Sequence, residues 1–179
     1  SVGWTSGSFV FSRLLSRWRE SDVILLGATL IVPSLVTTGV LVARDSSLIS
    51  ILAVFLLVGF SIGLVSTAGL TLIQTTSDES EMGRVNAAHQ FARNLSITLG
   101  VALGGAVVLS VVELRVGDVE VVRSVLAGEE VLVGADTREA VGAGLAWAHV
   151  PTVVIAVVSL GIALSLVRRG RATIQRHSH

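Results

Sequence analysis

Four long stretches of this chain contain no Asp, Glu, Lys or Arg, and they constrain its fold more than any other feature. They cover residues 23–43, 48–73, 94–112 and 140–167, which is 21, 26, 19 and 28 residues. A helix of about 20 apolar residues is long enough to cross a hydrocarbon core about 30 Å thick. Four such stretches in 179 residues therefore predict an all-α fold, a polytopic transmembrane helical bundle that contacts the lipid bilayer.

The composition agrees with a membrane protein and offers little chemistry. Only 15% of the residues are charged, where a soluble domain has about 25%. The absence of cysteine excludes disulfides and thiolate metal sites. No phosphate-binding loop, zinc-protease motif or nucleophile elbow is present. We therefore expect no catalytic residues, no enzyme activity, no cofactor, no metal and no nucleic-acid partner.

Short charged segments separate the apolar stretches and set the expected organisation. The first 12 residues are uncharged but too short to span a bilayer, so we expect the chain to begin partway through a transmembrane helix of a longer protein. The predicted segments are a partial transmembrane helix and the start of an Arg-rich cytoplasmic loop at 1–17, transmembrane helices at 22–44 and 47–74, a cytoplasmic-to-membrane helix at 79–113, an acidic extracytoplasmic loop at 114–137, a transmembrane helix at 138–168 and a cytoplasmic tail at 169–179.

The arginines predict the orientation in the cell membrane. If the helices cross in turn, nine arginines fall on one side and four on the other. Short loops rich in Lys and Arg stay cytoplasmic, so the C-terminus is predicted to be cytoplasmic. The richer side holds Arg13, Arg17, Arg19, Arg84, Arg93, Arg168, Arg169, Arg171 and Arg176, and the other holds Arg44, Arg115, Arg123 and Arg138.

One continuous helix is predicted to run from the cytoplasmic surface into the bilayer within residues 79–113. Asp78 and Glu81 have the spacing of a capping box, in which each side chain bonds the other residue's backbone. Arg93 is the last charge before the apolar stretch and is expected to reach back to water. A charge at the helix centre would cost about 2.5–3.5 kcal/mol, and the next charge is Glu113.

Two pairs of glycines have the spacing that lets helix backbones approach closely in lipid. They are Gly59 with Gly63 and Gly100 with Gly104. The simpler interpretation is static helix packing. The functional interpretation, which is compatible with the first, is that these faces rock during a conformational cycle.

Polar residues recur on one face of two predicted helices. Gly63, Thr67, Thr71 and Gln74 share one face, and Asn86, Gln90, Asn94 and Thr98 recur at every fourth position. Lipid offers no hydrogen-bond partners. These residues therefore either bond between helices and lie in an ordinary loop, or they line an aqueous cavity open to a solute. The candidates for such a cavity are Thr67, Thr71, Gln74, Asn94 and Thr98.

Three stretches of the chain resemble a known family. They are SFVFSRLLSRWRESDVILLG, FLLVGFSIGLVSTAGLTLIQ and GRVNAAHQFARNLSITLGVALGGAVV. Together they resemble the C-terminal part of a major facilitator superfamily transporter, most closely the EmrB/QacA-type drug:proton antiporters. Ser16 stands where the family's loop motif has Asp. The matching positions include Arg13 and Arg17 in one cytoplasmic loop, Gly83, Arg84 and Arg93 at the next, and Gly100 and Gly104 in the helix after it.

The resemblance implies a mechanism and partners. The family works by alternating access, with two helical halves rocking around a central site. It implies proton-coupled efflux of a drug-like or lipophilic compound, with protons, that small-molecule substrate and the missing N-terminal half of the same transporter as partners. The alternative is a truncated or partner-dependent membrane module without transport activity of its own.

Overall fold

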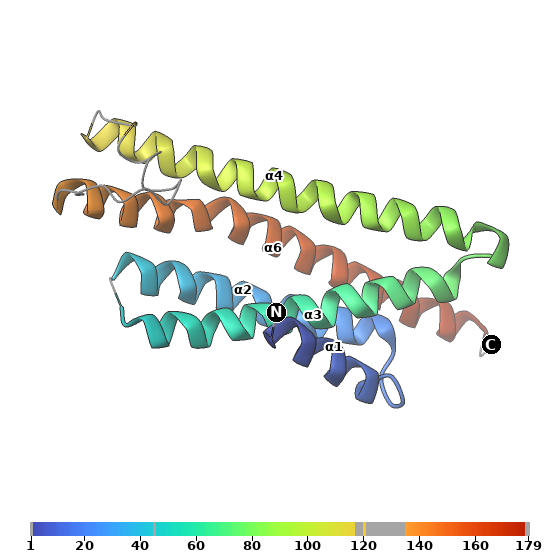
Figure 1. Cartoon of the computed structure of the whole chain (residues 1–179). Helices are drawn as coiled ribbons and strands as arrows, with labels where there is room; N and C mark the ends of the chain where they lie inside the picture. The colour runs from blue at the N-terminus through green and yellow to red at the C-terminus, as the bar shows by residue number, and fades with distance from the viewer. Residues whose placement is uncertain (1, 45, 117–119, 121–134, 178–179) are drawn as a thin grey trace.

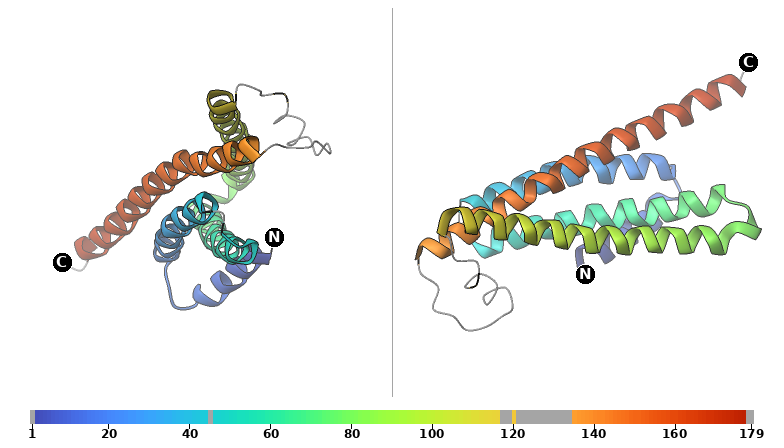
Figure 2. Two further views of the ribbon diagram at one scale, coloured as in Figure 1. Left: turned by 90° about the vertical axis from the view of Figure 1, so that its left-hand side faces the viewer. Right: turned by 90° about the horizontal axis from the view of Figure 1, so that it is seen from above.

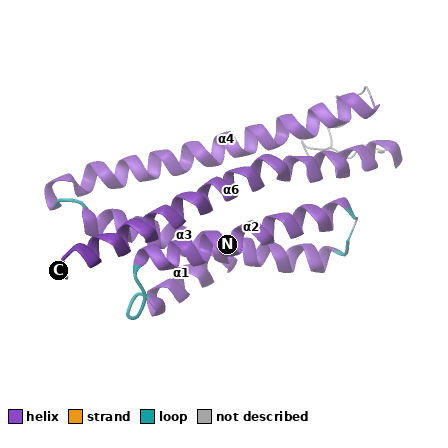
Figure 3. Ribbon diagram, turned by 180° about the vertical axis from the view of Figure 1, so that it is seen from behind, coloured by secondary structure: helices purple, strands orange, loops and turns teal. Residues whose placement is uncertain are grey.

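Helices make up almost all of the structure that can be described. The computed structural model describes residues 2–44, 46–116, 120 and 135–177. Over these residues the chain forms helices and connecting turns without a strand (Figure 3). The predicted all-α bundle is confirmed. The elements are α1 (Val2–Leu14), α2 (Glu20–Ala43), α3 (Leu48–Thr76), the short 3₁₀ helix η1 (Glu79–Glu81), α4 (Met82–Val116) and α6 (Ala135–His177) (Figure 1).

Four segments within the described chain are helical, long and apolar enough to cross a membrane. They are Glu20–Ala43, Leu48–Thr76, Glu79–Arg115 and Glu139–Arg169. Their outer faces carry large apolar side chains in the open, such as Ile49 at 80% and Val101 at 72% exposure. Contiguous apolar surface of this extent is unusual on a soluble monomer. Both observations indicate a membrane protein with several spans.

The helices pack in a chain of neighbours. α2 packs against both α3 and α6, α1 packs against α3, and α4 packs against α6. Figure 2 shows α6 crossing the bundle at an angle, so that its C-terminal part diverges from the other helices. α3 and α4 follow each other in the sequence, yet their contact is slight. The face of α4 that is turned from α6 is therefore left largely open.

Three small buried clusters hold these helix pairs together. Phe11, Val23, Leu64 and Ala68 join α1, α2 and α3. Leu35, Val58 and Ala156 join α2, α3 and α6. Val112 and Ala140 join α4 and α6. A membrane helix needs close packing but no single large core, because its outer face is compatible with lipid.

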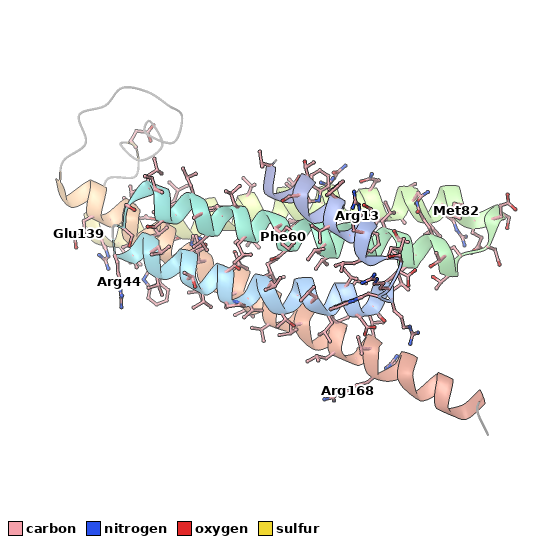
Figure 4. All side chains as sticks on the ribbon, turned by 90° about the horizontal axis from the view of Figure 1, so that it is seen from below. Arg13, Arg44, Phe60, Met82, Glu139 and Arg168 are labelled. Atoms are coloured by element: carbon pink, nitrogen blue, oxygen red, sulfur yellow. The ribbon has the colours of Figure 1, made fainter. Side chains whose placement is uncertain are left out.

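The two ends of the bundle carry different charged residues. Figure 4 places Arg13, Met82 and Arg168 towards one end of the bundle, and Arg44 and Glu139 at the other. The first end, which we call the arginine-rich end, also holds the turn between α1 and α2 and the start of α4. Its arginines are Arg13, Arg17, Arg19, Arg84, Arg168 and Arg169.

Helix boundaries differ from the predicted segments by a few residues, except at the C-terminus. α6 continues to His177, through most of the segment predicted as a tail at 169–179. α4 continues to Val116, past the predicted end at 113. Most of the loop predicted at 114–137 lies outside the described residues.

The capping box predicted at the start of α4 is wrong. Asp78 precedes η1 rather than α4, and its side chain makes no capping hydrogen bond. Glu81 instead accepts a hydrogen bond from Arg84, with Oε1 2.6 Å from Nη2. Arg84 lies three residues further along the same helical surface, so this exposed ion pair forms locally and takes the carboxylate away from the backbone.

Candidate functional site

Some of the predicted site residues lie in helix contacts, of which the α1–α3 contact is the closest, and the others are exposed. A Cβ atom placed on Gly63 would overlap the carbonyl oxygen of Trp4, and one on Gly7 would overlap that of Phe60. A Cβ on Gly59 would lie 3.3 Å from the Trp4 nitrogen. The two backbones therefore touch along a surface where only glycine fits, as small-residue motifs allow in lipid.

Sequence reasoning found only one side of this contact. Gly3 and Gly7 on α1 have the same four-residue spacing as Gly59 and Gly63, and a Cβ on Gly3 would lie 2.5 Å from the Leu56 carbonyl oxygen. The spacing of Gly3 and Gly7 could have indicated this contact from the sequence. It was not used, because α1 is too short to be recognised as a complete spanning helix.

The glycine pair on α4 has a different environment. Among the described residues nothing lies within 4 Å of a Cβ added to Gly100 or Gly104. The close α4–α6 contact is made instead at Gly144, where an added Cβ would lie 3.1 Å from the Val108 Cα. Gly100 is exposed and Gly104 is half-buried, and neither makes a close helix contact within the described chain.

The polar stripe of α3 is divided between two neighbouring helices. The hydroxyl of Thr67 lies 2.9 Å from that of Ser8 on α1. The amide nitrogen of Gln74 donates to Oδ1 of Asn86 on α4 at 3.1 Å. Thr71 donates to the Thr67 carbonyl oxygen of its own helix at 3.0 Å. All three α3 candidates are half-buried and hydrogen-bonded.

Beyond Asn86, which is half-buried and bonds to Gln74, the polar stripe of α4 is exposed. Asn94 and Thr98 are both exposed, and the Thr98 hydroxyl donates to the Asn94 carbonyl oxygen at 3.1 Å. Within the described chain the Asn94 side chain has no hydrogen-bond partner. The five cavity candidates are thus not brought together: three are engaged in the bundle, and two are exposed on α4.

The remaining candidates lie at or near the arginine-rich end. The Arg93 guanidinium carbon lies 5.1 Å from the centre of the Trp4 ring, which connects α4 to α1. Arg13 lies 5.1 Å from the centre of the Phe9 ring on its own helix. Arg17 and Gly83 are exposed, and Arg84 forms the ion pair with Glu81. Among the cationic candidates, only Arg93 joins two helices through a described contact.

Across the described residues, no group of three or more His, Asp or Glu side chains could hold a metal ion. In comparisons with known proteins, the chain matches no protein-family model, no curated protein and no solved structure.

Proposed function

We propose that this chain is the C-terminal part of a secondary active transporter of the major facilitator type, which works by alternating access in the plasma membrane. The proposal is supported by the three family-like stretches described above. It is also supported by the four helices that are long and apolar enough to cross a bilayer. The resemblance extends to the family's last five helices, and transport would require the helices that precede them.

The observation that carries the proposal is the exposed polar stripe of α4. Asn94 is the first residue of a 19-residue stretch without charge, and Thr98 lies one helical turn further along it. No described helix of this chain covers these two residues. An amide in contact with hydrocarbon would lack hydrogen-bond partners at a cost of several kcal/mol. A water-filled path shared with the other half of a transporter would satisfy this side chain and would expose it to a solute.

The direction and energy source of transport follow from the resemblance. We propose proton-coupled efflux of a drug-like or lipophilic compound, with the coupling carboxylates in the preceding helices. The arginine-rich end would face the cytoplasm, because Lys- and Arg-rich short segments are retained there. The C-terminus would then also be cytoplasmic.

A second candidate is a partner-dependent membrane module without transport activity of its own. The hydrogen bonds of Thr67 to Ser8 and of Gln74 to Asn86 favour it, because they engage the α3 stripe in packing. In this case the exposed α4 stripe would bond to a partner helix and would exclude water.

The test is proton-driven uptake of a fluorescent lipophilic dye into inverted membrane vesicles that contain the complete native protein. Asn94→Leu removes the exposed amide, and Ser110→Leu is the matched control on another exposed position of α4. With expression held equal, we expect Asn94→Leu to lose most of the uptake and Ser110→Leu to retain it. Equal uptake by the two variants, or no uptake by the unaltered protein, would contradict the proposal.

A further inference from the structure

A groove between α2 and α6 is separate from all the predicted site residues. It has a volume of about 500 Å³ and lies towards the end of the bundle that carries Arg44. Small-molecule pockets commonly enclose about 300–1,000 Å³. Its lining includes Gly39, Val40 and Ala43 from α2, and His149, Val150 and Val154 from α6.

His149 is the only side chain with a ring nitrogen acceptor among the residues that line this groove. A Cβ on Gly39 would lie 3.3 Å from the His149 Cβ, so the absence of a side chain at Gly39 makes room for the imidazole. His149 Nδ1 lies 2.8 Å from the Leu145 carbonyl oxygen. A carbonyl oxygen only accepts hydrogen bonds, so Nδ1 carries the proton and Nε2 of the neutral ring is an acceptor.

Trp147 also lines the groove, and its indole N–H is a hydrogen-bond donor. Among the described lining side chains, the groove therefore offers one donor, at Trp147, and one acceptor, at Nε2 of His149. A hydroxyl group both donates and accepts hydrogen bonds, so it can match either side chain.

The charges near the groove indicate which kind of hydrogen-bond donor a ligand could bring to His149. No acidic side chain lines it in the described structure, and Arg44 directly follows the lining residue Ala43. An ammonium group would therefore be desolvated without a counter-ion and placed near a positive charge, which is unfavourable. A neutral hydroxyl can donate to Nε2 without that cost.

We propose that this groove binds a single-chain lipophilic alcohol from the bilayer. Its hydroxyl donates to Nε2 of His149, and its hydrocarbon chain lies against Val40, Val150 and Val154. This inference does not rest on the proposed transport function, because it uses other helices and other residues.

The test uses Trp147 as the reporter. Trp4, Trp18 and any tryptophan outside this sequence are replaced by Phe, so that Trp147 is the single tryptophan of the protein reconstituted in phosphatidylcholine vesicles. The probes are a long-chain alcohol brominated along its chain and the brominated alkane of the same length. We expect the alcohol to quench Trp147 at about a tenfold lower mole fraction, the scale of one neutral hydrogen bond.

Two variants separate the parts of this inference. In the His149→Phe variant, the alcohol and the alkane are expected to quench Trp147 at the same mole fraction. Val154→Phe, which fills the groove, is expected to weaken quenching by the alcohol, whereas Val158→Phe is not. Val154 and Val158 are 57% and 58% exposed on the same helix, and only Val154 lines the groove.

Each outcome decides the proposal. Equal quenching by the alcohol and the alkane in the protein with His149 would show ordinary lipid contact and would overturn it. Equal effects of Val154→Phe and Val158→Phe would overturn it as well. If His149→Phe fails to fold, as judged by its thermal unfolding, the valine pair still tests the groove.

Discussion

The Arg93 guanidinium on α4 lies over the ring of Trp4 on α1, with its central carbon 5.1 Å from the ring centre. Arg93 is half-buried and directly precedes a 19-residue stretch without charge. A ring face attracts a cation and stabilises it where water is scarce. This contact joins α4 to the opposite side of a bundle in which α4 otherwise packs mainly against α6.

The first prediction concerns this pair. Trp4→Leu should lower the free energy of unfolding, and about 0.5–2 kcal/mol of that loss should depend on Arg93. The measurement is a double-mutant cycle with Trp4→Leu and Arg93→Gln in bilayers. Trp18→Leu is the control, since Trp18 is 45% exposed and Trp4 is 41% exposed. Additive effects of the Trp4 and Arg93 substitutions would show that the contact contributes nothing.

The second prediction separates two glycines that share the same motif. Gly63→Ala should destabilise the bundle by about 1–3 kcal/mol, because the added carbon overlaps the α1 backbone. Gly100→Ala should be neutral or should stabilise the helix by up to about 1 kcal/mol, because its surroundings are open in the described chain. The measurement is the free energy of unfolding of the two variants in detergent. Similar losses would mean that α4 has a close neighbour at Gly100 in the native protein.

The third prediction concerns the hydrogen bond between Thr67 and Ser8. Interhelical hydrogen bonds in membranes contribute about 0.6 kcal/mol on average. A cycle with Thr67→Val and Ser8→Ala should give a coupling energy of that size, since the two oxygens are 2.9 Å apart. Thr71→Val should show no coupling to Ser8, because the Thr71 hydroxyl bonds to its own helix. Coupling of Thr71 to Ser8 would contradict this arrangement.

The fourth prediction tests the orientation with single cysteines. The chain contains no cysteine, so Arg44→Cys and Ser80→Cys each introduce one label site within it. Both positions are exposed, and they lie at opposite ends of the bundle, Arg44 in the turn after α2 and Ser80 in η1 before α4. In a background without other cysteines, a membrane-impermeant maleimide should label Arg44→Cys in intact cells and should label Ser80→Cys only after lysis. The reverse pattern would invert the proposed topology.

Much of the fold could be predicted because water and hydrocarbon impose strong local constraints. Each uncharged stretch of about 20 residues must satisfy its own backbone, which only a helix does within one segment. The charged turns at Arg44 and around Asp78 then mark where helices end, and both turns lie between helices in the structure. The predicted capping box does not form, since Asp78 makes no capping hydrogen bond and the Glu81 carboxylate pairs with Arg84.

The candidate site was harder to predict. The spacing of polar residues shows which of them share a face of one helix, but it does not show which other helix that face contacts. Thr67, Gln74 and Asn94 were grouped by spacing alone, yet the first bonds to α1, the second to Asn86, and the third has no side-chain partner in the described chain. The partner of each side chain depends on how far apart the helices lie and at what angle they cross.

The sequence by itself determined that this protein is an all-α bundle with four helices suited to a bilayer, since that follows from the cost of placing charge and free backbone groups in hydrocarbon. Only the tertiary structure decided that Gly63 contacts α1 while Gly100 lies in the open, and that His149 lies against Gly39 in a groove. These relationships join helices that are distant in the sequence, so they arise from packing geometry and not from local pattern.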